Sequence, residues 1–461
     1  MNHPHDSAGI GAAMRRIVKQ AWPVLISQWA SMAYAVLDTA MTGHASSDAL
    51  AIMGLSISVY VTVFVGLMGV LHALIPILAQ HYGAGRLHEV GRAWGQGVWL
   101  ALALSVLGIA LMLFPNIWLA FSGDVEPAVR QGMASYLQAL CLALPAALVF
   151  RTIYALGTSV SRPQVVMIIN LIGLVCKAFF NWLLIYGKFG LPALGATGAG
   201  LSSALVAWIT LALGFGYLRR NSWYLQFNLT LGRPRWRDQQ ELLRLGLPMG
   251  GSYLVEVCAF TFMALLVARE GVYAVGAQQI MSNLAALCFM MPMSIGVATA
   301  SLAAQAIGAG RHDAARRISY AGLSAAIIGA ILTALLLTTQ RETIVALYTD
   351  DAEVAVMALA LLQIIPVFHL CDTLQCVNSY ILRAYKIAVV PLLLQIVALS
   401  GFGLLGGWWL GFGPAQGALT PLTDLLMAGA PIGASAMWLM ATLGLLLSAT
   451  LLHVWFRRVA P

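Results

Sequence analysis

Four ionisable residues lie inside long apolar segments of this sequence: Asp38, Lys177, Glu256 and Asp372. An ionisable group in a membrane-spanning helix costs at least about 2.5 kcal/mol on insertion scales, and it usually marks an ion path or a buried pair. Glu256 and Asp372 are predicted to have no basic partner at comparable depth in their own half of the chain. Two carboxylates that meet in a low-dielectric site cannot both stay ionised unless a cation joins them. This pair is therefore predicted to bind Na⁺ or H⁺; the alternative is that the four groups form two stabilising ion pairs.

Polar side chains near Asp372 in the sequence are candidates to complete an oxygen shell for Na⁺. They are Thr373, Gln375, Asn378 and Ser379. His369 lies one helical turn before Asp372, where a packed neutral imidazole is favoured over a proton-sensitive neighbour. If the protein is sodium-coupled, its metal site is predicted to be Glu256 with Asp372. No other cofactor is predicted.

The composition of the chain determines which elements can carry these residues. The chain has 461 residues, of which 60% are hydrophobic and only 9% are charged, with a mean hydropathy of +0.85. A soluble domain has about 25% charged residues, so a soluble enzyme, a disordered protein and a nucleic-acid binder are excluded. The sequence contains no catalytic motif and no nucleotide-binding loop. The predicted fold class is an all-α polytopic membrane protein without catalytic residues.

Windows of about 20 mostly apolar residues predict twelve transmembrane helices. They cover residues 20–43, 50–78, 94–115, 132–156, 164–186, 195–218, 243–268, 275–304, 318–339, 354–380, 388–411 and 433–456. Cytoplasmic segments carry an excess of Lys and Arg. With a cytoplasmic N-terminus, the outer segments hold only Arg130, Lys188, Arg269 and Arg341, and Lys177 lies inside a helix. Both termini are therefore predicted to be cytoplasmic, in a multi-pass protein of a bacterial inner membrane.

An internal repeat divides the predicted helices into two halves. The string AQHYGAGR at 79–86 recurs as AQAIGAGR at 304–311, and Pro23 and Pro248 have the same separation along the chain. Pro145 followed by Arg151 also resembles Pro366 followed by Asp372, at a slightly shorter separation. We expect an N-terminal six-helix half at 1–218, a cytoplasmic linker at 219–242 and a C-terminal six-helix half at 243–461. Because six is even, the halves are expected to be parallel repeats around a central cavity, as in one class of secondary transporters.

Several motifs, in order along both halves, resemble those of the multidrug and toxic compound extrusion (MATE) transporter family, in its NorM branch. The similar strings are Leu37-Asp38-Thr39-x-Met41-x-Gly43, Gln80-x-x-Gly83-Ala84-Gly85, Asn181-Trp182, Tyr186-Gly187-Lys188-Phe189-Gly190, Gly246-x-Pro248, Glu256-Val257, Met290-x-Pro292-Met293-Ser294-Ile295-Gly296 and Leu382-Arg383-x-Tyr385-Lys386. The resemblance implies a cation-coupled antiporter that exports cationic, amphiphilic drugs and dyes by alternating access. The expected partners are small organic cations and membrane lipid, without nucleic acid, and the protein is expected to be a monomer.

The resemblance also implies roles for individual residues. It places the coupling-cation site at Glu256 and Asp372, and substrate contacts at Asp351, Glu256 and Asp38. From its acidic surroundings alone, Asp351 is interpreted as a solvated loop charge. A rival interpretation is a lipid-linked oligosaccharide flippase of related architecture, whose cavity should be lined by many cationic residues. Only Arg151 and Lys177 are candidates for such a lining here.

The sequence departs from the family pattern at Lys177, where similar proteins carry Asn. Lys177 lies four residues before Asn181, so both side chains should lie on one helix face, directed towards Asp38 if the packing is that of the family. A fixed ammonium would then occupy the place of a bound cation. We expect a buried ion pair between Lys177 and Asp38; the competing hypothesis is that Asp38 is a free proton acceptor.

Overall fold

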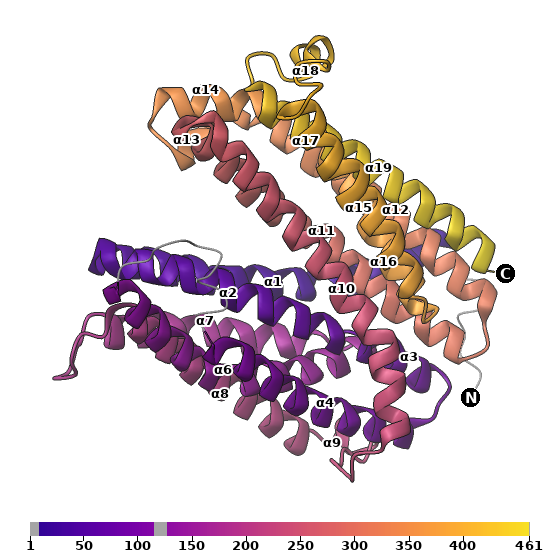
Figure 1. Ribbon diagram of the computed structural model, residues 1–461. Helices are drawn as coiled ribbons and strands as arrows, with labels where there is room; N and C mark the ends of the chain where they lie inside the picture. The colour runs from indigo at the N-terminus through magenta and orange to yellow at the C-terminus, as the bar shows by residue number, and fades with distance from the viewer. Residues whose placement is uncertain (1–8, 115–126, 461) are drawn as a thin grey trace. The chain divides into compact units, whose positions relative to one another are not determined.

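The computed structural model describes residues 9–114 and 127–460, and the regular elements in those ranges are helices (Figure 1). Those before residue 230 are α1 (Ile10–Ala45), α2 (Ser47–Leu71), α3 (Leu74–Gly83), α4 (Leu87–Leu113), α6 (Pro127–Ser159), α7 (Gln164–Ile185), α8 (Gly195–Arg220) and α9 (Ser222–Leu225). Those after it are α10 (Trp236–Val267), η1 (Ala268–Glu270), α11 (Val272–Gly308), α12 (His312–Thr339), α13 (Arg341–Tyr348), α14 (Ala352–Leu361), α15 (Ile365–Ala384), α16 (Val389–Gln395), η2 (Ile396–Leu405), α17 (Gly406–Gly411), α18 (Thr420–Leu426) and α19 (Ile432–Val459). The predicted span end at 115 and the predicted chain limits at 1 and 461 lie outside the described residues.

The predicted all-α membrane fold is confirmed. Within the described ranges, ten helices are long and apolar enough to cross a membrane, or eleven if α14 and α15, bent by 51°, form one span. The remaining predicted span, 20–43, lies in α1, which has 36 residues. Polar side chains such as Gln20, Gln28 and Asp38 make α1 less apolar than the others. Each predicted span therefore lies in one helix or in consecutive helices: 50–78 covers α2 and α3, 354–380 covers α14 and α15, and 388–411 covers α16, η2 and α17.

The helices form two compact units. One extends from Trp22 to Gly250; the other contains the chain from Gly251 onwards together with the first residues, up to Ala21. The chain thus passes between the units inside α1 and α10, next to Pro23 and Pro248. Proline lacks a backbone N–H and removes one intrahelical hydrogen bond. Each of these helices is therefore weakened where it leaves one unit for the other.

The internal repeat is visible in the backbone of the turn that contains the repeated string. Gly85 after α3 and Gly310 after α11 both have a φ of +73°, a left-handed conformation that glycine adopts without steric cost. The amide of Arg86 donates to His81 O at 3.0 Å, and the amide of Arg311 donates to Ala306 O at 2.9 Å. The same turn geometry therefore occurs at both copies of the string, which supports the repeat seen in the sequence.

The separation between the two copies of the string also holds further along the chain. Ser161 and Lys386, which follow α6 and α15 at this separation, have φ values of 61° and 59°. The range of α6, 127–159, likewise matches the range 352–384 from the start of α14 to the end of α15. The predicted equivalence of Pro145 with Pro366, at a shorter separation, is therefore wrong. Two prolines in matching helices give a chance alignment that the helix boundaries do not support.

The segment predicted as a linker, 219–242, packs closely against α4. A Cβ atom on Gly91 would come within 2.0 Å of Phe227 O, so only glycine allows this approach. Gln96 Nε2 donates to Arg233 O at 2.8 Å, and Gln96 Oε1 accepts from the amide of Arg235 at 2.9 Å. These contacts to backbone atoms hold the segment against the N-terminal helices.

The helix at 389–411 contains a wide, π-helical segment, Ile396–Leu405. Small residues allow α19 to approach it: a Cβ atom on Gly444 would lie 2.7 Å from Ala398 O. Most π-helical segments are single-turn insertions that are frequent at functional sites, whereas this one is ten residues long. Gln395, whose side chain faces Glu256, is the last residue before this segment.

Candidate ion-coupling and ligand-binding sites

Glu256 of α10 and Asp372 of α15 lie in the same unit, close enough to repel each other electrostatically. Both side chains are half-buried. A small ion can therefore reach them, although much of their surface is shielded from solvent. The structure thus brings together the two carboxylates that the sequence predicts to share a cation.

Two glutamine side chains converge on Glu256. Gln375 Nε2 donates to Glu256 Oε1 at 3.3 Å, and Gln395 Nε2 donates to the same oxygen at 3.4 Å. Both glutamines are fully buried, and neither Oε1 atom has a hydrogen-bond partner within the described part of the chain. A buried amide oxygen without a partner is costly, and amide and carboxylate oxygens suit hard cations. The ligand types present therefore fit a Na⁺ ion, which Glu256 and Asp372 would hold; each amide would have to turn over to offer its Oε1 instead of Nε2.

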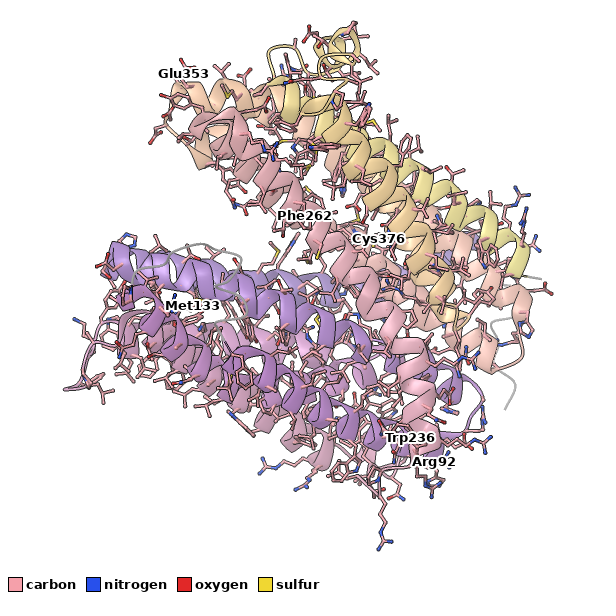
Figure 2. The ribbon with its side chains drawn as sticks, viewed as in Figure 1. Arg92, Met133, Trp236, Phe262, Glu353 and Cys376 are labelled. Carbon is pink, nitrogen blue, oxygen red and sulfur yellow. The ribbon has the colours of Figure 1, made fainter. Side chains whose placement is uncertain are left out.

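A basic residue also belongs to this cluster. Arg383 of α15 is only 4% exposed, and its Nη1 donates to Tyr253 Oη at 3.1 Å. Its guanidinium lies over the rings of Tyr253 and Tyr380, 5.0 and 4.7 Å from their centroids, and it interacts electrostatically with Glu256. The two tyrosine hydroxyls also share a hydrogen bond. Figure 2 labels Cys376, in the stretch of α15 between Asp372 and Arg383.

The sequence predicts no basic partner for the carboxylates at comparable depth in their own half, and to this the structure adds Arg383, which influences Glu256 electrostatically. Arg383 lies in a basic motif near a predicted helix end, a position that by sequence alone indicates the inner surface. It follows Asp372 by about three turns of a helix, so its spacing in the sequence does not by itself point to the carboxylates. With both carboxylates ionised, the cluster of Glu256, Asp372 and Arg383 carries one excess negative charge. One monovalent cation would neutralise it.

The other predicted shell residues are less directly involved. Asn378 Nδ2 donates to Leu374 O at 2.8 Å, and its Oδ1 lies 3.1 Å from His453 Nδ1, so this amide is engaged elsewhere. Thr373 and Ser379 have buried hydroxyls that lack a hydrogen-bond partner among the residues described. His369 is buried, as expected of a packed imidazole.

Asp351 is exposed and has a structural role at the start of α14. Its Oδ1 accepts hydrogen bonds from the amides of Glu353 and Val354, at 2.9 and 3.2 Å. This is the N-cap arrangement, in which a carboxylate satisfies backbone donors that have no partner inside the helix. This capping role explains why an Asp stands at this position, and the explanation needs no bound ligand.

The unit from Trp22 to Gly250 contains a cavity of about 250 Å³. Its aromatic lining consists of Tyr34, Tyr60, Phe64, Tyr136, Phe150 and Tyr154. Arg151 also lines it, with its guanidinium 5.6 Å from the ring centre of Phe64 and 5.7 Å from that of Tyr154. The two copies of the repeated string, at 79–86 and 304–311, define which positions of the two repeats are equivalent. In that alignment Ser31, Ala147 and Asn170, which line the cavity, are equivalent to Glu256, Asp372 and Gln395. The two repeats therefore carry an aromatic cavity and a charged cluster at equivalent positions.

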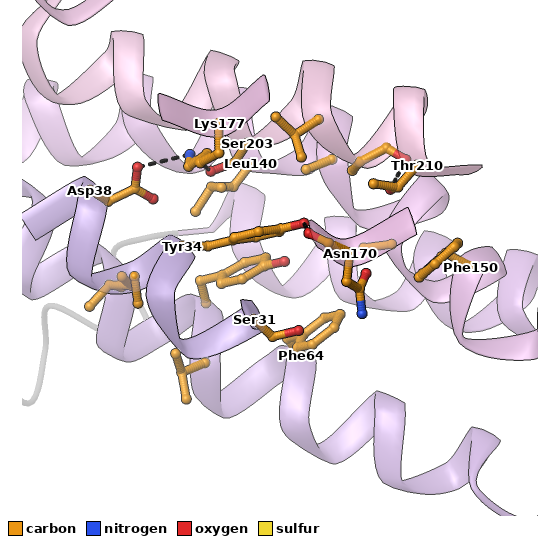
Figure 3. A pocket seen from close by; sticks show the side chains of 18 of the residues that line it. Ser31, Tyr34, Asp38, Phe64, Leu140, Phe150, Asn170, Lys177, Ser203 and Thr210 are labelled. Carbon is orange, nitrogen blue, oxygen red and sulfur yellow. Dashed lines mark hydrogen bonds and ion pairs between the residues drawn. The ribbon is translucent and has the colours of Figure 1, made fainter. Parts of the chain in front are cut away.

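Asp38 and Lys177 form the expected ion pair on the wall of this cavity (Figure 3). Lys177 Nζ lies 2.8 Å from Asp38 Oδ1, and Asn181 Nδ2 donates to the same oxygen at 2.8 Å. Lys177 and Asn181 thus share one face of α7, as their spacing predicts. The flippase interpretation requires many cationic residues, and of the two candidates, Arg151 and Lys177, the latter is neutralised by its partner. The lining has the charges of one ion pair and one arginine, not those of a strongly basic surface.

Two helical repeats, each with ionisable groups buried among apolar helices, define a multi-pass membrane protein of the secondary-transporter type. Known proteins agree with this class. The MatE family model matches residues 23–183 and again residues 248–409, one match in each repeat.

A probable multidrug resistance protein NorM of Aromatoleum aromaticum is 39% identical over 399 residues, which are 86% of each chain. A protein of the same name from Neisseria meningitidis serogroup A is 35% identical over 406 residues, covering 87% of both chains. The crystal structure of the eukaryotic MATE transporter AtDTX14 has a TM-score of 0.86 at 18% identity, over 98% of this chain and 96% of that one. The chain belongs to the MatE family, as the resemblance of its motifs predicts.

Proposed function

We propose that this protein is a cation-coupled multidrug efflux antiporter without enzymatic activity. Inward movement of Na⁺ or H⁺ would drive the export of cationic, amphiphilic drugs and dyes by alternating access. The observation that carries the proposal is the cluster of Glu256, Asp372 and Arg383, with its single excess negative charge. Relatives named as multidrug resistance proteins support the substrate class. The expected partners are organic cations and membrane lipid, and the protein is expected to act as a monomer.

Coupling requires that the ion and the drug favour different conformations, because a ligand shifts an equilibrium only by its differential affinity. Glu256 is accessible enough to exchange ions and is held by two glutamine amides and the field of Arg383. A cation that binds there removes the excess charge of the cluster, and its release restores that charge. An organic cation that competes for the same carboxylate would then be bound in one state and released in the other.

Dye export from cells or vesicles that lack other pumps tests this proposal. Glu256→Gln and Asp372→Asn each remove one ionisable group with little change of shape, so both should abolish export driven by an ion gradient. Glu342→Gln, on the exposed surface of α13, is the matched control and should export normally. Normal export by either site variant, at equal membrane levels, would remove that residue from the mechanism.

We propose that Asp351 contacts the substrate in addition to capping α14. Asp351→Asn keeps an Oδ1 acceptor for the cap and removes the charge. It should weaken the apparent affinity for a cationic dye without lowering the thermal unfolding midpoint. Unchanged dye affinity would leave Asp351 with the cap alone.

We also propose that both termini are cytoplasmic in a bacterial inner membrane, from the distribution of basic residues. In a variant with the exposed Cys258 replaced by Ser, a cysteine at 350 should react with an impermeant thiol reagent added outside. Cysteines at 88 and 313 should not react. The reverse labelling pattern would overturn the orientation.

A further inference from the structure

The ammonium of Lys177 lies in a complete shell of oxygen atoms. It contacts Asp38 Oδ1 at 2.8 Å, Ser203 Oγ at 2.6 Å and Ala199 O at 3.1 Å. Ser203 donates its own proton to Ala199 O at 3.1 Å, so its oxygen is available to accept. An ammonium has three N–H donors, and each therefore has one acceptor here.

Neither charge of the pair is exposed to solvent. The side chains of Lys177 and Asp38 are 1% and 7% exposed. A buried charge is tolerated only when it is paired and hydrogen-bonded. Among the described residues, no second carboxylate contacts this ammonium at ion-pair distance. The site therefore balances one negative charge with one positive charge.

The remaining atoms around Asp38 resemble a site for a small cation. Asn181 is fully buried, and its Oδ1 has no hydrogen-bond partner in the described part of the chain. A carboxylate, a hydroxyl, a backbone carbonyl and an amide oxygen are together the ligands of a hard monovalent cation. The ammonium of Lys177 lies where such a cation would contact the carboxylate of Asp38, the hydroxyl of Ser203 and the carbonyl of Ala199. The adjoining cavity (Figure 3) provides room for a small molecule beside the pair.

We propose that Lys177 is a tethered counter-cation. Its ammonium permanently fills a monovalent-cation site at Asp38, so the unit from Trp22 to Gly250 binds no exchangeable coupling ion. Without this side chain, the site would take a small alkylammonium or alkali-metal ion. The inference rests on the proposed function only where it assigns coupling to Glu256 and Asp372.

Chemical rescue of the full-length protein in detergent tests the site itself. Lys177→Ala should lower the thermal unfolding midpoint, because Asp38 is left without its partner. Replacing N-methylglucamine chloride by ethylammonium chloride at constant ionic strength should recover most of that loss. Lys188→Ala, which changes an exposed lysine, should show neither effect.

A second variant tests whether the rescue by ethylammonium depends on the carboxylate of Asp38. In Asp38→Asn/Lys177→Ala, ethylammonium should have no effect beyond that on the unmodified protein. Equal recovery in this double variant, or no recovery in Lys177→Ala, would overturn the proposal. If Lys177→Ala does not fold, Lys177→Asn serves instead, and its midpoint should rise with Na⁺ or ethylammonium more than that of the unmodified protein.

Transport measurements separate this inference from the proposed function. Asp38→Asn/Lys177→Met removes both charges and fills the space of the lysine stem; whatever it does to the apparent affinity for the dye, the dependence of dye export on the coupling-ion gradient should be unchanged. Loss of ion coupling in this folded variant would show that the pair carries the ion. If Glu256→Gln instead retains ion-driven export, the proposed function fails while the rescue result stands.

Discussion

Gln395 and Glu256 meet through a hydrogen bond of 3.4 Å from Nε2 to Oε1, although they belong to helices far apart in the sequence. The π-helical segment begins directly after Gln395. A change at Gln395 should therefore affect the carboxylate without removing any charge.

Gln395→Leu should weaken the dependence of export on the coupling ion. The substitution removes one donor to Glu256 and one buried amide oxygen. Loss of a supporting hydrogen bond at an ion site typically reduces affinity by about 10- to 100-fold. The measurement is the initial rate of dye export against the concentration of Na⁺ or H⁺. Gln416→Leu, at an exposed position, is the control, and equal ion dependence in both variants would contradict the assignment.

Arg383→Gln should destabilise the protein, because Glu256 would lose a nearby positive charge and Tyr253 would lose a hydrogen bond. Adding Glu256→Gln should recover part of that stability by removing one of the two acids. A double-mutant cycle on thermal unfolding measures the coupling, which should exceed about 0.5 kcal/mol. Tyr253→Phe keeps the ring but removes the hydroxyl that bonds to both Arg383 and Tyr380, and it should cost about 1 kcal/mol for each bond lost. Strict additivity of Arg383→Gln and Glu256→Gln would show that the two residues act independently.

Glu270→Ala should destabilise the start of α19. Glu270 Oε1 and Oε2 accept hydrogen bonds from the amides of Gly433 and Ala434, at 2.6 and 2.8 Å. Loss of a helix cap costs about 0.5–2 kcal/mol, and Glu270→Gln should cost less because it keeps one acceptor. Thermal unfolding compared with Glu342→Ala, an exposed acid, checks this. Equal midpoints would mean that the cap contributes nothing.

Gly91→Ala and Gly216→Ala should have opposite effects. A Cβ on Gly91 would come within 2.0 Å of Phe227 O, whereas a Cβ on Gly216 has nothing within 4 Å. The first should lower the unfolding midpoint and the yield, because the segment 219–242 must move away from α4. The second should be neutral or stabilising by about 0.5–1 kcal/mol, since alanine loses less backbone entropy in a helix. A tolerated Gly91→Ala would show that this segment is held only loosely.

Much of the candidate site follows from composition and spacing. Asp38, Lys177, Glu256 and Asp372 stand out because each charge interrupts an apolar run, and the cost of placing it there does not depend on the rest of the fold. One helical period predicts that Lys177 and Asn181 share a face of α7, and the resemblance to the family adds that this face is directed towards Asp38.

The sequence by itself determined the helical membrane fold, the repeat and these four charges, because hydropathy, helical period and desolvation cost are properties of short segments. Only the tertiary structure decided that Gln375 and Gln395 hydrogen-bond to Glu256 and that Arg383 influences it electrostatically. Those contacts join helices distant in the sequence, and Gln395 and Arg383 carry no local mark that separates them from a surface residue. Their roles depend on which helix faces pack together, and packing is decided by the shapes of many side chains at once.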